Sequence, residues 1–588
     1  FKLDAGDVTV RNVVFTKGRI NGSLGGGILV QNPESKLTLD HCDIVNNVIE
    51  NSMHMGGAGI SIGYAAKVTM LNCIVSDNSL INPNGGAYGG GIQLITSGQN
   101  TELTMTLCTI EQNTASFTGT APGYGGGIFI SGEGASATLT NCIIRDNIAA
   151  TQGSGDGGGI DIRTDATINI TNCIIQNNTS SEQSNGIGGG IALVGGVTAV
   201  LSDTVITGNS ASLSGDESNA GSGGGIYLEN STMIINNSPT KKISGNYAVK
   251  NYDADKQSAS GYGGGICVTG ASALLTLTNC TIEENTAATY SYGFGGGLAI
   301  NGHASVLVAG ELTVQANKAT ESVVNGRNGY GGGFYIDESS LTVNTDGVLS
   351  VVENKASASI LSNSAPGNGG GFWLKNVTLI NNGTINVTGN IASETLSGNG
   401  GGIFISDGAC EIKNFTITGN TALHDEIEAG IIGRGGGIYV NTTSGAGVTI
   451  ANTIISSNRA TINAPGEGGG IYINATANLK ISSGLVSNNV ASRFGASNGN
   501  GIYAGETFSV EGSTSVEIDN DVFLRNGKTI NIIGDLTASN AATLTPEFLI
   551  NELQVLFGNL TLDTIEKFSI STEDRKSTRL NSSHGKLS

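Results

Sequence analysis

A run of glycines followed by one apolar residue recurs along almost the whole chain, and this recurrence restricts the fold more than any other feature. The segment "GYGGGIFISGEGASATLTNCIIRDNIAA" (residues 123–150) is a typical copy. Successive copies start 31 to 40 residues apart, and periods of about 20–50 residues indicate a stacked repeat architecture. The apolar residues that follow the glycine runs are Ile28, Ile60, Ile92, Ile128, Ile160, Ile191, Ile226, Ile266, Leu298, Phe334, Phe372, Ile403, Ile438, Ile471 and Ile502.

Each copy contains three short segments with the pattern of β-strands. They read G-G-G-I-x-I, x-L-x-L-x-N and C-x-I-x-x-N-x-A, with alternating polarity and frequent Val, Ile and Thr. Three strands per turn, each paired with its counterpart one copy later, predict an all-β, right-handed parallel β-helix of about 14–15 coils. Its core is expected to hold Ile128, Ile130, Leu139, Cys142 and Ile144.

The repeat divides the chain into three regions. We expect residues 1–505 to form the β-helix and residues 506–572 to form a β-rich capping or linking tract. The end of the chain, "RKSTRLNSSHGKLS", resembles translated adapter sequence, so residues 573–588 are expected to be disordered and foreign to the natural protein. The chain begins within the pattern at Phe1, and we expect it to be a piece of a longer protein whose export signal lies elsewhere.

One asparagine recurs in the I-x-x-N motif of every copy that aligns. Asparagine tolerates the left-handed backbone of a tight corner, and stacked amides can hydrogen-bond along the axis as a ladder. The glycines are expected where a Cβ would collide with adjacent coils. A phosphate-binding role for them would need a G-K-[ST] sequence and a following helix, and neither is present. The expected ladder residues are Asn47, Asn78, Asn113, Asn147, Asn178, Asn209, Asn246, Asn285, Asn317, Asn354, Asn390, Asn420, Asn458 and Asn489.

The charge of the chain restricts its partners. A net charge of −20 argues against nucleic acid and against anionic membrane surfaces. No apolar run approaches the roughly 20 residues of a membrane helix, so this segment is not expected to insert into a membrane. Most length variation falls between the ladder asparagine and the next glycine run, which predicts a ridge of loops. The longest, within residues 246–266, carries Asp253 and Asp255 as candidate binding residues.

An aromatic stripe is expected in the C-terminal half of the β-helix. The outward residue of the first strand is aromatic in six consecutive copies: Tyr335, Trp373, Phe404, Tyr439, Tyr472 and Tyr503. Stacked about 4.8 Å apart, these rings would offer sugars or a partner protein a flat strip. The alternative is that they stack on one another or are covered. A second aromatic set precedes the glycine runs and is expected to be structural: Tyr88, Tyr124, Tyr262, Phe294 and Tyr330.

The cysteines are expected to be structural. Six of the 8 share one inward position on the third strand, where parallel Cβ vectors orient the sulfurs poorly for disulfides. We therefore expect buried, reduced thiols that act as small apolar side chains, with Cys410 also inward. Cys267 is expected to face outward as the one accessible thiol. The spacings match no zinc motif, and no metal or other cofactor is expected. The six are Cys42, Cys73, Cys108, Cys142, Cys173 and Cys280.

A catalytic alternative exists because polysaccharide lyases and glycoside hydrolases use the parallel β-helix fold. Asp161, Arg163 and Asp165 in "GGGIDIRTD" are the nearest candidate cluster, and alternation places all three outward on or beside one strand. The neighbouring copies have Gln93, Phe129 and Ala192 at the corresponding position, so a solvated face is the simpler interpretation. The five histidines are scattered, without a nucleophile-base pattern.

The paired G-G-G-I and I-x-x-N motifs resemble the G-G-A-[ILV] and F-x-x-N repeats of chlamydial polymorphic outer membrane proteins. More broadly, they resemble right-handed β-helix surface proteins of host-associated bacteria, over residues 20–505. The resemblance implies export, surface display and adhesion, with no catalytic residue to assign. We expect a secreted or outer-membrane stalk that binds a host glycan, or a matrix or cell-surface protein. The alternatives are a carbohydrate-active enzyme and a passive spacer.

Overall fold

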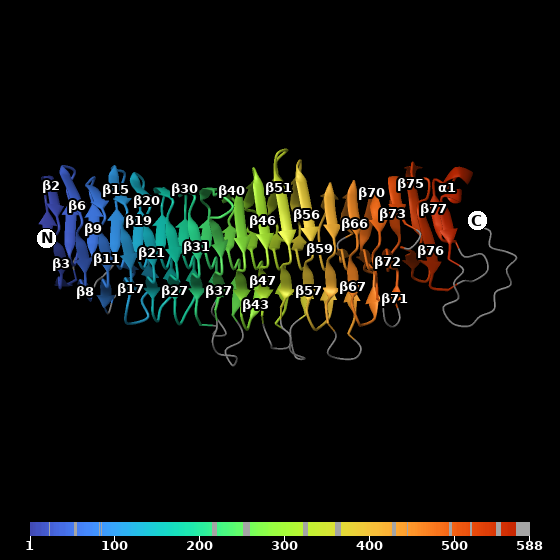
Figure 1. Cartoon of the computed structure of the whole chain (residues 1–588), viewed down its shortest axis with the longest axis horizontal. Coiled ribbons are helices and arrows are strands. Elements are labelled where there is room, and N and C mark those ends of the chain that lie inside the picture. Colours follow the sequence, from blue (N-terminus) through green and yellow to red (C-terminus); the bar gives the residue numbers. More distant parts are fainter. Residues whose placement is uncertain are drawn as a thin grey trace.

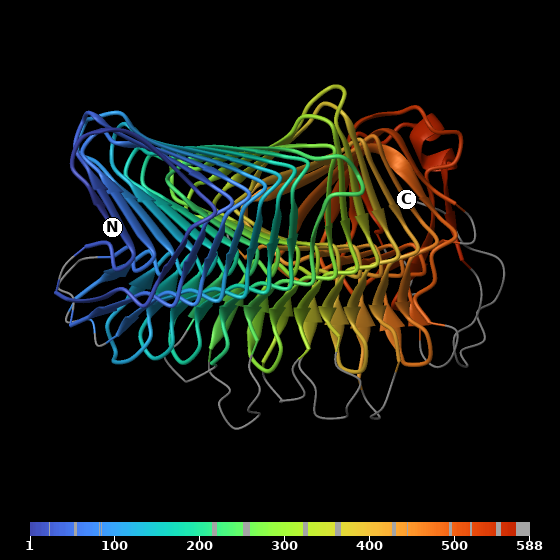
Figure 2. The ribbon, with the colours of Figure 1, turned by 60° about the vertical axis from the view of Figure 1, so that its left-hand side comes forward.

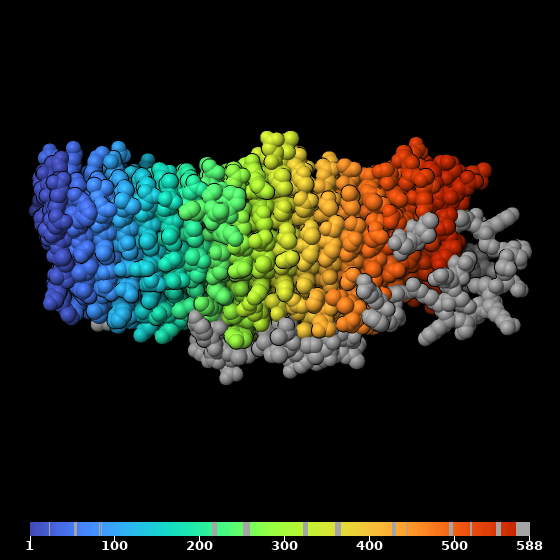
Figure 3. Space-filling view, in the orientation of Figure 1, coloured from blue at the N-terminus to red at the C-terminus, as the bar shows by residue number. Residues whose placement is uncertain are grey.

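The described chain forms one elongated rod, with β2 (Gly6–Arg11) near one tip and α1 (Leu562–Glu566) near the other (Figure 1). The computed structural model describes residues 1–571, except 23, 52–55, 82, 84, 215–219, 251–258, 322–326, 359–365, 426–430, 444, 493–496, 518–519 and 549–553. Consecutive parts of the sequence occupy consecutive bands along the rod (Figure 3). In the described part of the chain, the strand pairs between successive coils are parallel, and most are in continuous register, as between β19 (Ile128–Ser131) and β24 (Ile160–Arg163). The molecule is a parallel β-helix, as its sequence predicts.

Five columns of strands, here named sheets A to E, run along the rod. One coil passes through β19, β20 (Ala135–Thr140), β21 (Ile143–Arg145), β22 (Ile148–Ala150) and β23 (Gly155–Asp156), in sheets A, B, C, D and E respectively. Within the described residues, sheet B has 12 strands from β2 (Gly6–Arg11) to β55 (Thr378–Asn381). Sheet C has 20, from β3 (Val14–Thr16) to β77 (Leu556–Gly558), and sheet D has 14, from β4 (Arg19–Asn21) to β67 (Arg459–Thr461).

Sheets A and E position the candidate site. In the described chain, sheet A has 19 strands: β1 (Lys2–Leu3), β5 (Ile28–Gln31), β9 (Ile60–Gly63), β14 (Ile92–Ile95), β19, β24, β29 (Ile191–Val194), β34 (Ile226–Glu229), β39 (Ile266–Thr269), β44 (Leu298–Asn301), β49 (Phe334–Asp337), β54 (Phe372–Lys375), β59 (Ile403–Asp407), β64 (Ile438–Val440), β69 (Ile471–Ile473), β72 (Ile502–Ala504), β74 (Val522–Leu524), β76 (Ala542–Pro546) and β78 (Phe568–Ile570).

Sheet E has 13 strands among the described residues, most of them two residues long. They are β13 (Ala87–Tyr88), β18 (Gly123–Tyr124), β23, β28 (Gly186–Ile187), β33 (Ala220–Ser222), β38 (Ser260–Tyr262), β43 (Tyr292–Phe294), β48 (Gly329–Tyr330), β53 (Gly367–Asn368), β58 (Gly398–Asn399), β63 (Gly433–Arg434), β68 (Gly466–Glu467) and β71 (Ser497–Asn498).

The sequence predicts three strands per coil, and the structure corrects this number to five over most of the rod. The third expected segment breaks at its ladder asparagine, so that its two halves belong to sheets C and D. The residues just before the glycine run add the short strand of sheet E. These extra strands lie beside the main body, where sheet D strands such as β17 (Thr114–Ser116) and β27 (Thr179–Ser181) follow the lower edge in Figure 1.

Sheets A, B and C enclose the main core. All five residues that the sequence assigns to the core of one coil are at most 1% exposed: Ile128, Ile130, Leu139, Cys142 and Ile144. Equivalent side chains of other coils belong to the same continuous cluster, which extends from Leu3 to Phe568. Burial of each such aliphatic side chain contributes roughly 1.5–3 kcal/mol. Figure 2 shows the successive coils that share this core lying one behind another.

Sheets D and E pack closely as a thin two-layered fin, and their close packing explains two elements that recur in the repeat pattern. A Cβ on Gly123 of sheet E would lie 1.7 Å from the carbonyl oxygen of Ala149 in sheet D. In the next coil, a Cβ on Gly155 would likewise lie 1.7 Å from the carbonyl oxygen of Ser180. Only glycine fits against the small inward residue of sheet D at this separation. The alanine of N-x-A and the glycine before the glycine run are therefore packing partners.

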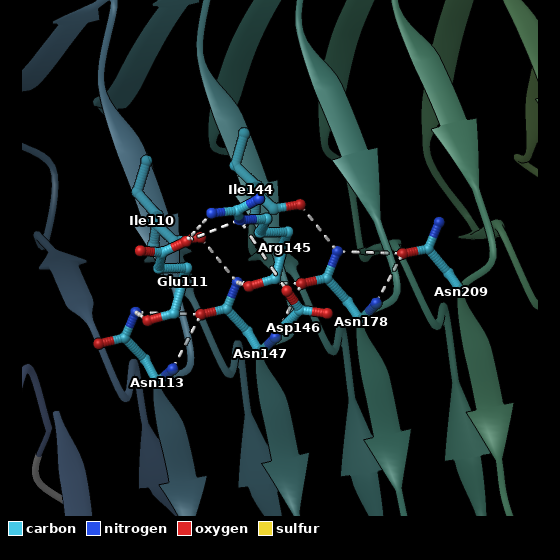
Figure 4. A network of polar contacts seen from close by, with 9 residues as sticks. All are labelled: Ile110, Glu111, Asn113, Ile144, Arg145, Asp146, Asn147, Asn178 and Asn209. Carbon is cyan, nitrogen blue, oxygen red and sulfur yellow. Dashed lines mark hydrogen bonds and ion pairs between the residues drawn. The ribbon is translucent and has the colours of Figure 1, made fainter. Parts of the chain in front are cut away.

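The ladder asparagines form one continuous, buried column of hydrogen bonds along the corner between sheets C and D (Figure 4). The backbone N–H and Nδ2 of Asn113 both donate to Oδ1 of Asn147, at 3.1 and 3.0 Å. Asn147 repeats both contacts with Asn178, and its Nδ2 also donates to the carbonyl of Ile110 at 3.0 Å. The column begins at Gly18, whose N–H donates to Asn47, and ends on Asn520.

The left-handed corner residue is not the ladder asparagine, contrary to our expectation. The residue immediately before it has positive φ, as in Asp146 (55°) and Ala316 (52°). The asparagine itself is selected for its amide, because the side chain must point along the axis. A second asparagine takes the left-handed conformation at the corner between sheets B and C, as Asn141 does (φ 54°) directly before Cys142. This accounts for the recurrent Asn-Cys pair.

The coils continue beyond residue 505, where the repeat motif ends. Strands β74, β76 and β78 extend sheet A in parallel register from β72. The change at residue 505 is therefore a change of sequence motif within one continuous helix of strands. The short helix α1 (Leu562–Glu566) lies near the C-terminal tip. With 19 strands in sheet A of the described chain, the rod is about 86 Å long at about 4.8 Å per coil.

Replacement of one ladder residue tests the contribution of the column. Asn147→Ala leaves two buried N–H groups of Asn113 without their acceptor, and we expect a loss of roughly 2–5 kcal/mol in unfolding free energy. The measurement is chemical denaturation followed by circular dichroism. Asn169→Ala, at an exposed position of the next coil's sheet B strand, is the control and should change stability by less than about 0.5 kcal/mol. Equal effects of the two variants would contradict the account.

Candidate functional site

The outward faces of sheets A and E meet in a concave face along the rod. The turn between them is made by the first glycine of each run, such as Gly125 (φ 63°), where a Cβ would lie 2.2 Å from the carbonyl oxygen of Ile128. This tight turn brings the outward rows of both sheets into contact. The ring centroids of Tyr88 and Phe129 lie 4.8 Å apart, and those of Phe294 and Tyr335 lie 5.1 Å apart. The concave face is therefore a continuous surface shared by two sheets.

The six aromatic residues of the expected stripe lie in sheet A and stack in two runs. Among the described residues, Tyr335 stacks on Trp373 with centroids 4.6 Å apart, and a second run continues from Phe404 to Phe523. Tyr335 and Trp373 are each 8% exposed. Rings inside a run cover one another's faces, so this row offers mainly ring edges to solvent. The flat strip of ring faces suggested by the sequence is not presented.

The second aromatic set lies on sheet E and packs against the first. Tyr262, Phe294 and Tyr330 stack on one another, with centroids 4.6 and 5.1 Å apart. Phe294 meets Tyr335 at an interplanar angle of 74°, and Tyr330 meets Trp373 at the same angle. Tyr88 and Tyr124 form a separate stack closer to the N-terminal end. The two aromatic rows are thus one apolar surface that passes from sheet E to sheet A along the rod.

A groove of about 490 Å³ lies where the two aromatic rows overlap. Its lining comes from β38, β43, β48 and β53 of sheet E and from β49, β54 and β59 of sheet A. Volumes of about 300–1,000 Å³ are typical of small-molecule sites. The lining residues are Ser260, Tyr292, Phe294, Tyr330, Tyr335, Asn368, Trp373, Phe404 and Ser406.

A charged cluster occupies the same concave face closer to the N-terminal end. Asp161 is fully buried, and its Oδ2 accepts a hydrogen bond from Nε of Arg163 at 2.8 Å. The guanidinium of Arg163 also pairs with Asp156 of sheet E and lies 4.6 Å from the ring centroid of Tyr124. Asp165, which the sequence groups with Asp161, instead lies exposed in the next turn with φ 57°. Asp156 takes its place in the cluster.

Burial and mutual repulsion set the protonation of this cluster. Burial first and the nearby charge of Asp161 second raise the pKa of Asp156 to about 7, although the neighbouring Arg163 lowers it. Burial also raises the pKa of Asp161. One oxygen of Asp161 has no hydrogen-bond partner among the described residues. Two carboxylates therefore share one guanidinium at a site that water reaches poorly.

All eight cysteines are free and buried, and this corrects one expectation. Cys267 points outward from sheet A but is only 2% exposed, because it packs among Tyr227, Tyr262 and Ala299. Alternation along a strand gives the direction of a side chain and not what covers it. Burial raises the pKa of the Cys267 thiol to about 12, so it is not an accessible, reactive thiol.

The candidate loop residues Asp253 and Asp255 lie outside the described residues, as do residues 573–588. The loop that carries the two aspartates connects β37 (Tyr247–Val249) of sheet D to β38 of sheet E. No group of three or more His, Cys, Asp or Glu side chains in the described part of the chain could hold a metal ion. No described helix is both long and apolar enough to cross a membrane.

Three features of the structure escape sequence reasoning. Asn520 continues the ladder from a tract without the I-x-x-N motif. Asp156 joins the charged cluster from a strand of two residues that has no periodicity to reveal it. Ion pairs also link adjacent coils on the outer surface, as between Arg145 and Glu111 at 2.6 Å in Figure 4. Register partners such as these could be found by aligning the copies column by column.

The comparison with known protein families supports the fold. A family model described as a right-handed β-helix region matches residues 3–157. Together with parallel coils that continue to residue 570, this match defines a right-handed parallel β-helix repeat protein. No curated protein matches the chain.

The pH dependence of stability tests the charged cluster. The pKa of Asp156 is about 7 in the folded state and about 3.9 in an unfolded chain. The folded state therefore binds more protons between about pH 4 and 7, and stability should fall as the pH rises through this window. Asp156→Asn removes the titrating group, so its stability relative to the parent protein should rise from pH 4 to pH 8.

Denaturation midpoints at pH 4, 6 and 8 provide this measurement. Loss of the ion pair with Arg163 changes the stability of Asp156→Asn by an amount of its own. The way in which the stability difference from the parent protein varies with pH reports the proton equilibrium of Asp156. Asp165→Asn, at an exposed carboxylate of the same coil, is the control. A constant difference between Asp156→Asn and the parent across the three pH values would show that Asp156 does not titrate in this window.

Proposed function

We propose that this chain is an exported bacterial surface protein that acts as an elongated rod for adhesion or display. Its site of action would be secreted or at the outer membrane, as its resemblance to polymorphic outer membrane protein repeats implies. The support is a rod of about 86 Å whose coils are joined by continuous ladders. A net charge of −20 favours solubility and disfavours association with anionic membranes.

The observation that carries this proposal is the aromatic concave face. Tyr335, Trp373 and Phe404 are held by the rigid strands of sheet A and meet the rings of sheet E in one groove. Rigid aromatic side chains provide contact area at little cost in conformational entropy. A binding face built on strands of a rod holds its geometry while the rod extends away from its point of attachment. The ligand is a host glycan, or a matrix or cell-surface protein.

A second candidate function is a carbohydrate-active enzyme, and the cluster of Asp156, Asp161 and Arg163 favours it. A carboxyl group with a pKa of about 7 is suited to general acid or base catalysis near neutral pH. Asp161, however, is fully buried and ion-paired with Arg163, so its carboxylate is not exposed to a substrate in solution. A passive spacer is the third candidate, and it needs no binding face.

An array of glycans and host-matrix proteins, probed with the full chain, tests the proposal. We expect retention on at least one glycan or matrix protein. A parallel incubation with uronic-acid and neutral polysaccharides, assayed for new reducing ends and unsaturated products, should show no depolymerisation. Depolymerisation that is lost in Asp156→Asn would replace adhesion with catalysis. If the chain neither binds any member of the array nor depolymerises a polysaccharide, the adhesive role is overturned and the passive spacer is the remaining candidate function.

A further inference from the structure

We propose that the groove around Trp373 is a binding subsite for a neutral hexose oligosaccharide. This inference rests on the proposed adhesive function and names the site and the chemical class of its ligand. The groove combines aromatic rings with uncharged hydrogen-bonding groups at its sides, and the lining residues that the structure describes carry no charge.

The aromatic part of the groove lies where the ring stacking along sheet A is interrupted. Trp373 and Phe404 are register partners on β54 and β59, but stacking pairs Trp373 with Tyr335 and Phe404 with Tyr439. Among the described residues, no ring stacks on the Trp373 face toward Phe404; only 8% of Trp373 is exposed, and this exposed part borders the groove. The apolar C–H face of a hexose can pack on this exposed part of the indole and on the neighbouring rings of Tyr330, Tyr335 and Phe404 that line the groove. The backbone register also shifts here, between Leu374 and Lys375.

The sides of the groove supply polar groups at the same level. In sheet E, the aromatic residues end at Tyr330 and are followed by Asn368 and Asn399 in the next two coils. Nδ2 of Asn399 donates to Oδ1 of Asn368 at 2.9 Å, which orients the Asn368 amide beside Trp373. Ser406 adds a hydroxyl group from β59. Hexose hydroxyl groups can both donate to and accept from amide and hydroxyl groups of this kind.

The absence of charge in the lining favours a neutral ligand. All nine lining residues that belong to the described part of the chain are uncharged, although the chain has 48 acidic and 28 basic residues. On sheet A, the carboxylate of Asp337 accepts a hydrogen bond from the Tyr335 hydroxyl at 3.2 Å and pairs with Lys375. The described lining offers no cation to the carboxylates of a uronic-acid polymer or an acidic peptide; the Arg327 guanidinium lies beside the groove, over the ring of Tyr292 at 5.0 Å from its centroid. A basic peptide would bring cations to a site without carboxylates in its lining. A neutral sugar carries no such unpaired charge into the groove.

Trp373 is the only tryptophan of the chain, so its fluorescence reports directly on this groove. The full, unmodified chain is titrated separately with cellohexaose, maltohexaose and mannohexaose, and with hexagalacturonate as the anionic comparison. We expect a saturable change in tryptophan emission with at least one neutral hexasaccharide and no change with hexagalacturonate. No response to any neutral hexasaccharide, or a response to hexagalacturonate, would overturn the proposal.

Two variants separate the subsite from general effects on the fold. Asn368→Ala removes one hydrogen-bonding amide, keeps the fluorophore and should weaken binding by about 5- to 10-fold. Tyr472→Ala removes a ring of the same row outside the groove and should leave the affinity within about two-fold. Equal weakening by both variants would refute a local site. Retention on the glycan array without any response of Trp373 would refute the subsite and leave the adhesive function standing.

Discussion

The asparagine column is the interaction on which the rest of the structure depends. Each internal amide uses its oxygen for two donors of the preceding coil and its nitrogen for the next amide and a backbone carbonyl, as Asn147 does. A buried amide with fewer partners would cost about 1–3 kcal/mol per missing bond. A coil displaced by a single residue would lose this set of contacts and turn its inward side chains outward. The column therefore fixes the register of the coils between Gly18 and Asn520 on their neighbours.

Register has a direct consequence for the surface, because equivalent residues of successive coils must lie in rows. Small residues of sheet D meet glycines of sheet E and form the fin, and the tight glycine turn brings sheets A and E together. Aromatic residues in these rows then stack automatically at the spacing of the coils. A distinctive site can arise only where a row changes composition. The change from Tyr330 to Asn368 in sheet E and the separation of Trp373 from Phe404 in sheet A coincide at such a place.

Most of the fold is predictable from the sequence because the repeat has the period of the structure. The core positions around Ile128 and the parallel pairing of coils follow from alternation and spacing. Contacts between the outward residues of sheet A and those of sheet E cannot be derived from alternation and spacing. The covering of Cys267 by rings of neighbouring strands, and the pairing of Asp156 with Arg163 across the concave face, depend on the sharp turn between sheets E and A. A strand of two residues has too little pattern to reveal that turn.

The left-handed corners show a different limit of sequence reasoning. The sequence identifies the invariant asparagine but cannot distinguish a residue selected for its backbone from one selected for its amide. The structure separates the two roles: Asp146 makes the turn, and Asn147 makes the ladder. In the same way, Asn520 occupies a ladder position because of its place in the coil, although the tract around it has lost the motif.

Deletion of one complete coil tests the central claim, that each coil is a unit held in register by the columns. Removal of residues 160–190 joins one glycine run to the next apolar residue and allows Asn147 to meet Asn209 in place of Asn178. Far-UV circular dichroism should then retain the β spectrum and a cooperative unfolding transition. Removal of residues 160–175, which is about half a coil, should abolish both. Loss of the fold in the first deletion, or tolerance of both deletions, would contradict the account.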